Sequence, residues 1–243
     1  MNSFRIIPKL EIKSNYVIKG MRMEGFKKVG DPIKLASKFS KMQFDEISYQ
    51  DIVASWFDKE LDIDQLKKVS KRINVPLSVS GGIKNIKLAK RLLDNGADKI
   101  ILNTHAVENP SLIEELSRIY GSQSISVSIH FKKINNIYEV FTENGRKRTF
   151  IKIFDWLQIV QNYGAGEISI ISINNDGMNK MIEDTSLLEK IRKKVNVPLL
   201  YGGGVNTQKS IKKLARLKFN GVFLSRILYS GKQNIKDLTK GIN

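Results

Sequence analysis

Short apolar runs alternate with longer amphipathic stretches along the whole chain. Eight runs have the length and β-branched content of buried strands, and they cover residues 5–12, 46–50, 77–80, 99–103, 124–130, 167–173, 199–201 and 221–225. Helical periodicity fills the intervals between them, for example at 32–41, 63–72 and 110–120. Asp31 followed by Pro32 is a typical helix start, with an N-cap and a proline at the first helical position.

This alternation predicts an α/β protein. Strands separated by helices pair in parallel through right-handed crossovers. Eight such units in 243 residues fit a single (β/α)8 barrel, which uses about 250 residues, better than an open doubly wound sheet. The run 137–141, with Asn144-Gly145 behind it, breaks the pattern and predicts a hairpin inserted after the fifth strand.

The second half of the chain repeats the first. Residues 65–76 and 187–198 share a pattern that ends in Asn-Val-Pro in both, at an offset of 122 residues. An apolar run and a glycine cluster follow each, and Glu46-Ile47-Ser48 recurs as Glu167-Ile168-Ser169. A long period present twice indicates two fused half-barrels, about 1–121 and 122–243.

Composition narrows the class of protein. The chain has no Cys and two His, so we expect no disulfide, no metal site and no cofactor bound through such ligands. No apolar run approaches the roughly 20 residues that span a bilayer, and the first residues do not resemble a signal peptide. We therefore expect a soluble, cytoplasmic protein without a membrane partner.

The formal net charge of +17 permits several partners: nucleic acid, a phosphorylated small molecule or an acidic protein. The basic residues are spread over the chain, and clusters such as Lys67-Lys68 fall on helical stretches, where they form a solvated face. No nucleic-acid-binding module is recognisable, so nucleic acid is not the expected partner.

Function in such a barrel collects at the carboxyl ends of the strands. The first strand ends near Glu11 and the fifth at His130, which the repeat places at equivalent positions across the barrel mouth. A carboxylate facing an imidazole is a candidate acid/base pair. The alternative is a loop carboxylate and a hydrogen-bonded histidine at the rim.

Glycines and small polar residues follow other strands in two groups. Gly81-Gly82 and Asn103-Thr104 belong to strands three and four, whereas Gly202-Gly203-Gly204 and Ser225 belong to strands seven and eight. Glycine lets backbone N–H groups approach an anion, and a helix N-terminus favours negative charge. The pattern favours two phosphate cradles and an elongated ligand with a phosphate at each end, although turns also use glycine.

Charged residues begin four strands, at the opposite face. Arg5, Glu46, Lys99 and Glu167 supply two cations and two anions near the expected barrel axis. They predict a ring of salt bridges, and charges at this face ordinarily serve stability.

Further short motifs extend over the whole chain. They are Arg5-Ile6-Ile7-Pro8, Val17-Ile18-Lys19-Gly20, Gly30-Asp31-Pro32, Gly81-Gly82-Ile83, Gly96-Ala97-Asp98-Lys99, Tyr120-Gly121-Ser122-Gln123, Gly164-Ala165-Gly166-Glu167-Ile168 and Asp176-Gly177. Together they resemble the cyclase subunit of imidazole glycerol phosphate synthase. The resemblance implies a (β/α)8 barrel on whose N-terminal face a glutaminase subunit docks. It also implies that ammonia passes along the barrel axis to a substrate with two phosphates.

The resemblance assigns roles by position. Arg5, Glu46, Lys99 and Glu167 match the charged gate of the ammonia channel, and Asp98 matches a residue that faces the glutaminase. The substrate-side positions are Lys19 in a mobile loop, Asp51 and Asp176 as polar residues, Gly82, Asn103 and Thr104 at one phosphate, and Gly177, Gly203 and Ser225 at the other.

The chain departs from the family at the catalytic positions. The family has aspartates where this chain has Glu11 and His130, and Ile171, Asn174 and Tyr201 are further changes expected at the mouth. A retained gate with an altered acid/base pair predicts a divergent paralogue. In that hypothesis ammonia goes to another phosphorylated acceptor, or to a sugar amidotransferase of surface-glycan biosynthesis.

Two alternatives stay open at this point. One is a genuine histidine-pathway cyclase that works with Glu11 and His130. The other is a non-catalytic channel subunit that docks on the glutaminase and activates it.

Overall fold

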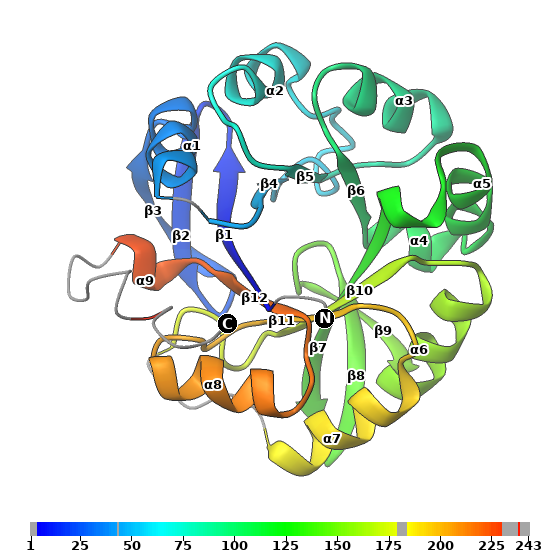
Figure 1. Cartoon of the computed structure of the whole chain (residues 1–243). Helices are drawn as coiled ribbons and strands as arrows, with labels where there is room; N and C mark the ends of the chain where they lie inside the picture. Colours follow the sequence, from blue (N-terminus) through cyan, green and yellow to red (C-terminus); the bar gives the residue numbers. More distant parts are fainter. Residues whose placement is uncertain (1–3, 43, 179–183, 230–237, 239–243) are drawn as a thin grey trace.

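A computed structural model describes residues 4–42, 44–178, 184–229 and 238 of the chain. Its centre is a closed ring of eight parallel strands (Figure 1). In spatial order these are β1 (Arg5–Lys13), β4 (Ile47–Asp51), β5 (Leu77–Ser80), β6 (Lys99–Leu102), β7 (Ile125–Ile134), β10 (Glu167–Ser172), β11 (Leu199–Gly202) and β12 (Gly221–Leu224). Because β12 pairs in parallel with β1, the ring has no open edge, which confirms the (β/α)8 barrel.

Helices surround the ring on its outer side (Figure 1). They are α1 (Pro32–Lys41), α2 (Ile63–Ser70), α3 (Ile86–Asp94), α4 (Thr104–Glu108), α5 (Ser111–Tyr120), α6 (Ile153–Asn162), α7 (Thr185–Lys194), α8 (Gln208–Arg216) and α9 (Arg226–Tyr229), with a 3-10 turn η1 (Ser122–Ser124). Side-chain caps fix several starts: Asp31 accepts from the Lys34 amide at 2.8 Å, as the sequence predicts.

Buried apolar side chains form two main layers, with a small third cluster of Ile18, Ile52 and Val53. The larger layer lies between strands and helices and contains residues such as Ile47, Val127 and Trp156. The smaller cluster includes Ile7, Ile101, Ile171, Leu200 and Phe223, which alternate with the first set along their strands and therefore face the barrel interior. The strands β1, β6, β10, β11 and β12 thus divide their apolar residues between an outer core and an inner one.

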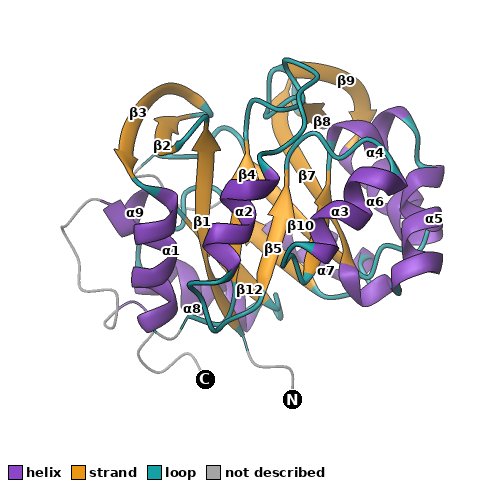
Figure 2. Cartoon of the chain, turned by 90° about the horizontal axis from the view of Figure 1, so that it is seen from above, coloured by secondary structure: helices purple, strands orange, loops and turns teal. Residues whose placement is uncertain are grey.

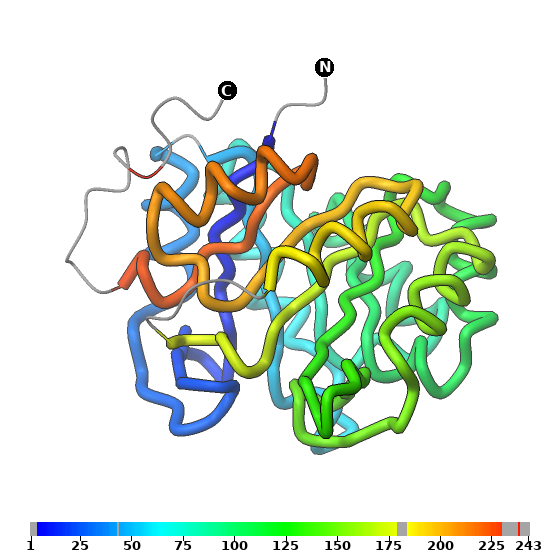
Figure 3. The backbone as a smooth tube through the Cα atoms, turned by 90° about the horizontal axis from the view of Figure 1, so that it is seen from below, coloured from blue at the N-terminus to red at the C-terminus, as the bar shows by residue number. Residues whose placement is uncertain are grey.

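Two antiparallel extensions stand at the carboxyl end of the barrel (Figures 2 and 3). The predicted hairpin after the fifth strand is present as β8 (Ile137–Thr142) and β9 (Lys147–Lys152), added to β7. A second hairpin, β2 (Tyr16–Met21) with β3 (Glu24–Gly30), extends β1 and was not predicted. The first and fifth strands consequently continue beyond Glu11 and His130, because each pairs with the next antiparallel strand.

The two repeated segments occupy equivalent places. Residues 65–76 run from α2 to the start of β5, and residues 187–198 run from α7 to the start of β11. The two half-barrels stay a prediction, and their outermost residues 1–3 and 239–243 lie outside the described part. Within the described residues, no helix has the length and apolar character needed to cross a membrane.

Candidate functional site

A ring of ion pairs occupies the amino-terminal end of the barrel. Arg5 contacts both Glu46, at 2.8 Å, and Glu167. Lys99 lies 2.9 Å from Glu167 and 3.3 Å from Glu46. Burial alone would lower the pKa of Arg5, but Glu167 and Glu46 outweigh it and leave that pKa raised. Four charges from β1, β6, β10 and the residue before β4 therefore form the predicted ring, while Asp98 is exposed beside it.

Serines line much of the interior above this ring. Ser48, Ser126 and Ser169 are buried, and their hydroxyl oxygens have no hydrogen-bond partner among the described residues. Branched apolar side chains usually fill the centre of such a barrel. An unsatisfied buried hydroxyl costs about 1–3 kcal/mol, so this interior is built for small polar molecules more than for tight apolar packing.

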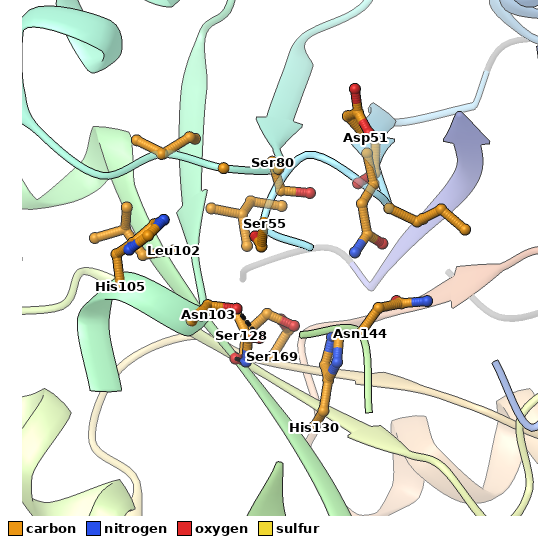
Figure 4. Close-up of a pocket in the computed structure, with 18 of the residues that line it drawn as sticks. Asp51, Ser55, Ser80, Leu102, Asn103, His105, Ser128, His130, Asn144 and Ser169 are labelled. Carbon is orange, nitrogen blue, oxygen red and sulfur yellow. Dashed lines mark hydrogen bonds between the residues drawn. The ribbon is translucent and has the colours of Figure 1, made fainter. Parts of the chain in front are cut away.

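A cavity of about 40 Å³ connects this interior with the mouth (Figure 4). Its deep wall includes Ser48 and Ser169, and its outer wall includes Asp51, Gly82 and Asn103. One water-sized molecule needs roughly 10–15 Å³, so the cavity has room for about three molecules the size of water or ammonia. The cavity thus lies between the charged ring and the strand ends.

The residues predicted to bind the first phosphate lie together at this cavity. Gly82 has φ +62°, and a Cβ there would lie 2.8 Å from the Lys59 carbonyl oxygen. Asn103 donates to the Ser128 carbonyl oxygen at 2.8 Å, and the Thr104 hydroxyl accepts from the Glu143 amide at 3.0 Å. The site therefore uses glycine where the backbone approaches another chain segment closely.

Asp51 lies at the same rim. Burial raises the pKa of the Asp51 carboxyl, although the amides of Val53 and Ala54 donate to it at 3.0 Å and act in the opposite direction. These two bonds fix the turn after β4. Asp51 also lines the cavity.

A buried charge cluster forms the other side of the mouth. Lys19 lies 2.7 Å from Glu11 and 3.1 Å from Asp176, and the Ser225 hydroxyl lies 3.4 Å from Glu11. Burial alone would lower the pKa of Lys19, but Glu11 and Asp176 outweigh it and leave that pKa raised. Lys19 was predicted in a loop; it lies instead on strand β2, where the hairpin folds over the mouth and buries it.

His130 lies across the ring from this cluster, on β7, and is 2% exposed (Figure 4). Burial, with a smaller contribution from the charge of Lys9, lowers the pKa of His130 to about 3. The imidazole of His130 is therefore neutral at pH 7. Its Nδ1 has no hydrogen-bond partner among the described residues.

The residues predicted to bind the second phosphate lie less close together. Gly177 accepts a hydrogen bond from Arg226, and Ser225 contacts Glu11. Gly203 has φ +92°, and a Cβ there would lie 2.4 Å from the Ser172 carbonyl oxygen. None of these three residues lines the 40 Å³ cavity, so the structure separates the two predicted groups.

Tyr201 was predicted at the mouth, and this prediction is wrong. It belongs to the outer apolar layer, and its ring lies 6.2 Å from that of Phe219. Ile171, on the adjacent strand β10, does face the interior. The strand Leu199–Gly202 is apolar throughout its first three positions, so alternation gave no sign of which face each residue takes.

The sequence reasoning missed Lys9 and the interior serines. Lys9 lies on β1, an even number of residues from Arg5 and Glu11, and it is 8% exposed. Period-two alternation applied to that strand would have placed all three on one face. Within the described residues, no group of three or more His, Cys, Asp or Glu side chains could hold a metal ion.

The fold and the two ends of its axis define the chain as a (β/α)8 barrel with a charged ring at one end and a polar mouth at the other. A family model described as "Histidine biosynthesis protein" matches residues 5–234, and the chain belongs to this family.

Relatives over most of the length are subunits HisF of imidazole glycerol phosphate synthase. The chain is 41% identical to that of Flavobacterium psychrophilum over 84% of this chain and 80% of the relative. It is 35% identical to that of Pyrococcus furiosus, over 96% and 93%. It is 36% identical to that of Campylobacter concisus, over 98% and 95%.

Proposed function

We propose that the chain is the synthase subunit of a glutamine-dependent amidotransferase of the imidazole glycerol phosphate synthase type. It receives ammonia from a glutaminase subunit at its amino-terminal face and adds it to a phosphorylated acceptor at its mouth. The relatives' name supports the cyclase reaction of histidine biosynthesis more strongly than the divergent acceptor predicted from the sequence.

The observation that carries this proposal is the order of features along the barrel axis. The ring of Arg5, Glu46, Lys99 and Glu167 lies at one end, unpartnered serine hydroxyls follow, and the mouth cavity comes next. Serine hydroxyls both donate and accept hydrogen bonds, so they suit neutral ammonia as well as water. The ring then acts as the channel gate, with exposed Asp98 towards the glutaminase.

At the mouth, each predicted residue has a role in this proposal. Glu11 and His130 are the acid/base pair, and Lys19, Asp51 and Asp176 are the charged groups beside the substrate. Gly82, Asn103 and Thr104 bind one phosphate, and Gly177, Gly203 and Ser225 bind the other.

One observation favours a second candidate, an acceptor other than the cyclase substrate. A histidine with a pKa of about 3 accepts a proton poorly and is not present as the imidazolium acid at pH 7. Glu11 is also held by Lys19 at 2.7 Å. A protein that only conducts ammonia to a third component, such as a sugar amidotransferase of surface-glycan biosynthesis, needs no acid/base pair there.

Steady-state turnover with ammonium salt and the doubly phosphorylated cyclase substrate tests the proposal. We expect measurable turnover, and E11Q should reduce kcat about a hundredfold or more, because general acid–base groups contribute at least that much. E60Q, which alters an exposed carboxylate of the pair Arg91–Glu60, is the matched control and should match the parent chain.

Absence of turnover would distinguish the remaining candidates. Recovery of activity in the double variant E11D/H130D would assign the loss to the acid/base pair and favour another acceptor. A calorimetric titration that detects no binding of the doubly phosphorylated ligand, with glutaminase activation intact, would favour the non-catalytic channel subunit.

A further inference from the structure

Two buried lysines lie at the mouth, and their surroundings differ. Lys19 is held between two carboxylates, so it is a fixed ammonium group. Lys9 is 8% exposed, and its Nζ makes no hydrogen bond or ion pair with any residue that the structure describes. The centroid of the Phe223 ring lies 5.9 Å from its Nζ. Lys9 is therefore an amine buried without a counterion in contact.

The charges around Lys9 favour its neutral form. Burial lowers the pKa of Lys9; Glu11 and Asp176 oppose this, and the nearby charge of Lys19 adds to it, with a lowered pKa as the result. His130, Asp51 and His105 are the other titratable residues that line the cavity with Lys9, and the imidazole of His130 is neutral. A desolvated lysine next to another cation is the usual arrangement of a nucleophilic amine, because both effects expose the nitrogen lone pair.

Lys9 also lies at the right place for chemistry on a substrate. It lines the mouth cavity together with Ser48, Ser169 and His130, so it is between the charged ring and the strand ends. Asn103 and Gly82 of the first predicted phosphate site line the same cavity. A phosphorylated molecule bound there would present its neighbouring carbons to this amine.

We infer that Lys9 is a nucleophile that forms an imine with the ketone or aldehyde carbon of a phosphorylated substrate. Its Nζ attacks the carbonyl carbon, a C–N bond forms, and the carbonyl oxygen becomes the hydroxyl of a carbinolamine. Proton transfer from nitrogen to that hydroxyl, through water, releases one water molecule and leaves the C=N bond. The two hydrogens of the departing water balance those lost from the amine.

An imine at this place suits ammonia transfer, a step that rests on the proposed function. Ammonia entering from the charged ring adds to the C=N carbon, the Lys9 nitrogen leaves as the free amine, and the substrate keeps the new C=N bond to nitrogen. No oxidant or reductant takes part, and Lys9 returns to its starting state.

Reductive trapping tests the inference in the isolated full-length chain, without glutaminase and without ammonia. The protein is incubated with dihydroxyacetone phosphate, a small ketone with one phosphate, then treated with sodium borohydride and digested for peptide mass mapping. We expect one predominant adduct on Lys9, at least tenfold above any other lysine, and suppression by excess inorganic phosphate. Adducts spread over exposed lysines with Lys9 unmodified would overturn the inference.

Variants separate the nucleophile from a mere charge. K9M and K9R should both abolish the predominant adduct, whereas K13M, which changes an exposed lysine at the end of the same strand, should leave it unchanged. Turnover of K9R at the parent rate would show that only a positive charge is needed and would contradict the inference. Mapping of the adduct in the parent chain tests the inference even where a Lys9 variant does not fold.

Ammonium chloride added before borohydride separates this inference from the proposed function. Loss of the trapped adduct as ammonium concentration rises supports exchange with ammonia. If ammonium does not reduce the amount of adduct on Lys9, Lys9 is still the nucleophile, but the proposed transfer of ammonia to the imine is contradicted.

Discussion

The neutral state of His130 has a consequence for stability. Its folded pKa, about 3, lies below the value of 6.5 for an unperturbed histidine. The unfolded chain therefore binds a proton more tightly than the folded chain between these values. Stability from the neutral, buried ring is fully present above pH 6.5 and is lost as the pH falls towards 3.

We predict that H130N removes this acid sensitivity. Between pH 7 and pH 5 the parent chain should lose about 2 kcal/mol more unfolding free energy than H130N, at about 1.4 kcal/mol per pH unit below the unfolded pKa. Urea unfolding at both pH values measures the difference. H105N changes the other histidine, on α4, and should keep the parent's acid dependence; equal pH slopes for the parent and H130N would contradict the assignment.

At the scale of single residues, the sequence predicted the ring and most of the mouth because those residues begin or end strands. It could not predict the state of Lys9 or His130. The proton affinity of Lys9 depends on burial and on charges from Glu11, from Lys19 on β2 and from Asp176 after β10. That of His130 depends on burial and on the charge of Lys9, which lies on a strand far away in the sequence.

Among the elements, the hairpin β2–β3 shows why local signals were insufficient. Its turn places Arg22 and Met23 at positive φ, a conformation that usually requires Gly or Asn. Asp176 holds this turn: its backbone oxygen accepts from the Arg22 amide at 2.8 Å and its carboxylate from the Met23 amide at 3.2 Å. A tertiary contact therefore stabilises a turn that the local residues disfavour.

We predict that D176A loosens this hairpin. Loss of charge-assisted hydrogen bonds, each contributing about 1.5–3 kcal/mol, should increase local opening about tenfold or more. Limited digestion with trypsin, followed by mass spectrometry, should show faster cleavage after Arg22. D94A, which breaks the exposed pair Lys90–Asp94, should cleave there at the parent rate, and an unchanged rate for D176A would show that the hairpin does not depend on this contact.

For the whole molecule, the charged ring joins strands that lie far apart in the sequence. Glu167 on β10 contacts Arg5 on β1 and Lys99 on β6. Removing one member of a buried ion-pair network leaves the others uncompensated, which costs about 3–5 kcal/mol, whereas an exposed pair contributes about 0–1 kcal/mol.

We predict that E167A destabilises the chain by about 3 kcal/mol, at the low end because the Arg5 side chain is 23% exposed. The double variant E167A/K99M removes a cation as well and should recover part of the loss. Urea unfolding at pH 7 measures both, with E60A as the exposed control. Equal losses for E167A and E60A would show that the ring contributes nothing to stability.

The sequence by itself determined the (β/α)8 barrel, the hairpin β8–β9 and the residues near the strand ends, because strand–helix alternation and turn residues are local properties of the chain. Only the tertiary structure decided which residues face the interior, how Lys19 differs from Lys9, and why His130 is neutral. The physical reason is that desolvation and charge–charge interactions depend on distances that closure of the barrel creates.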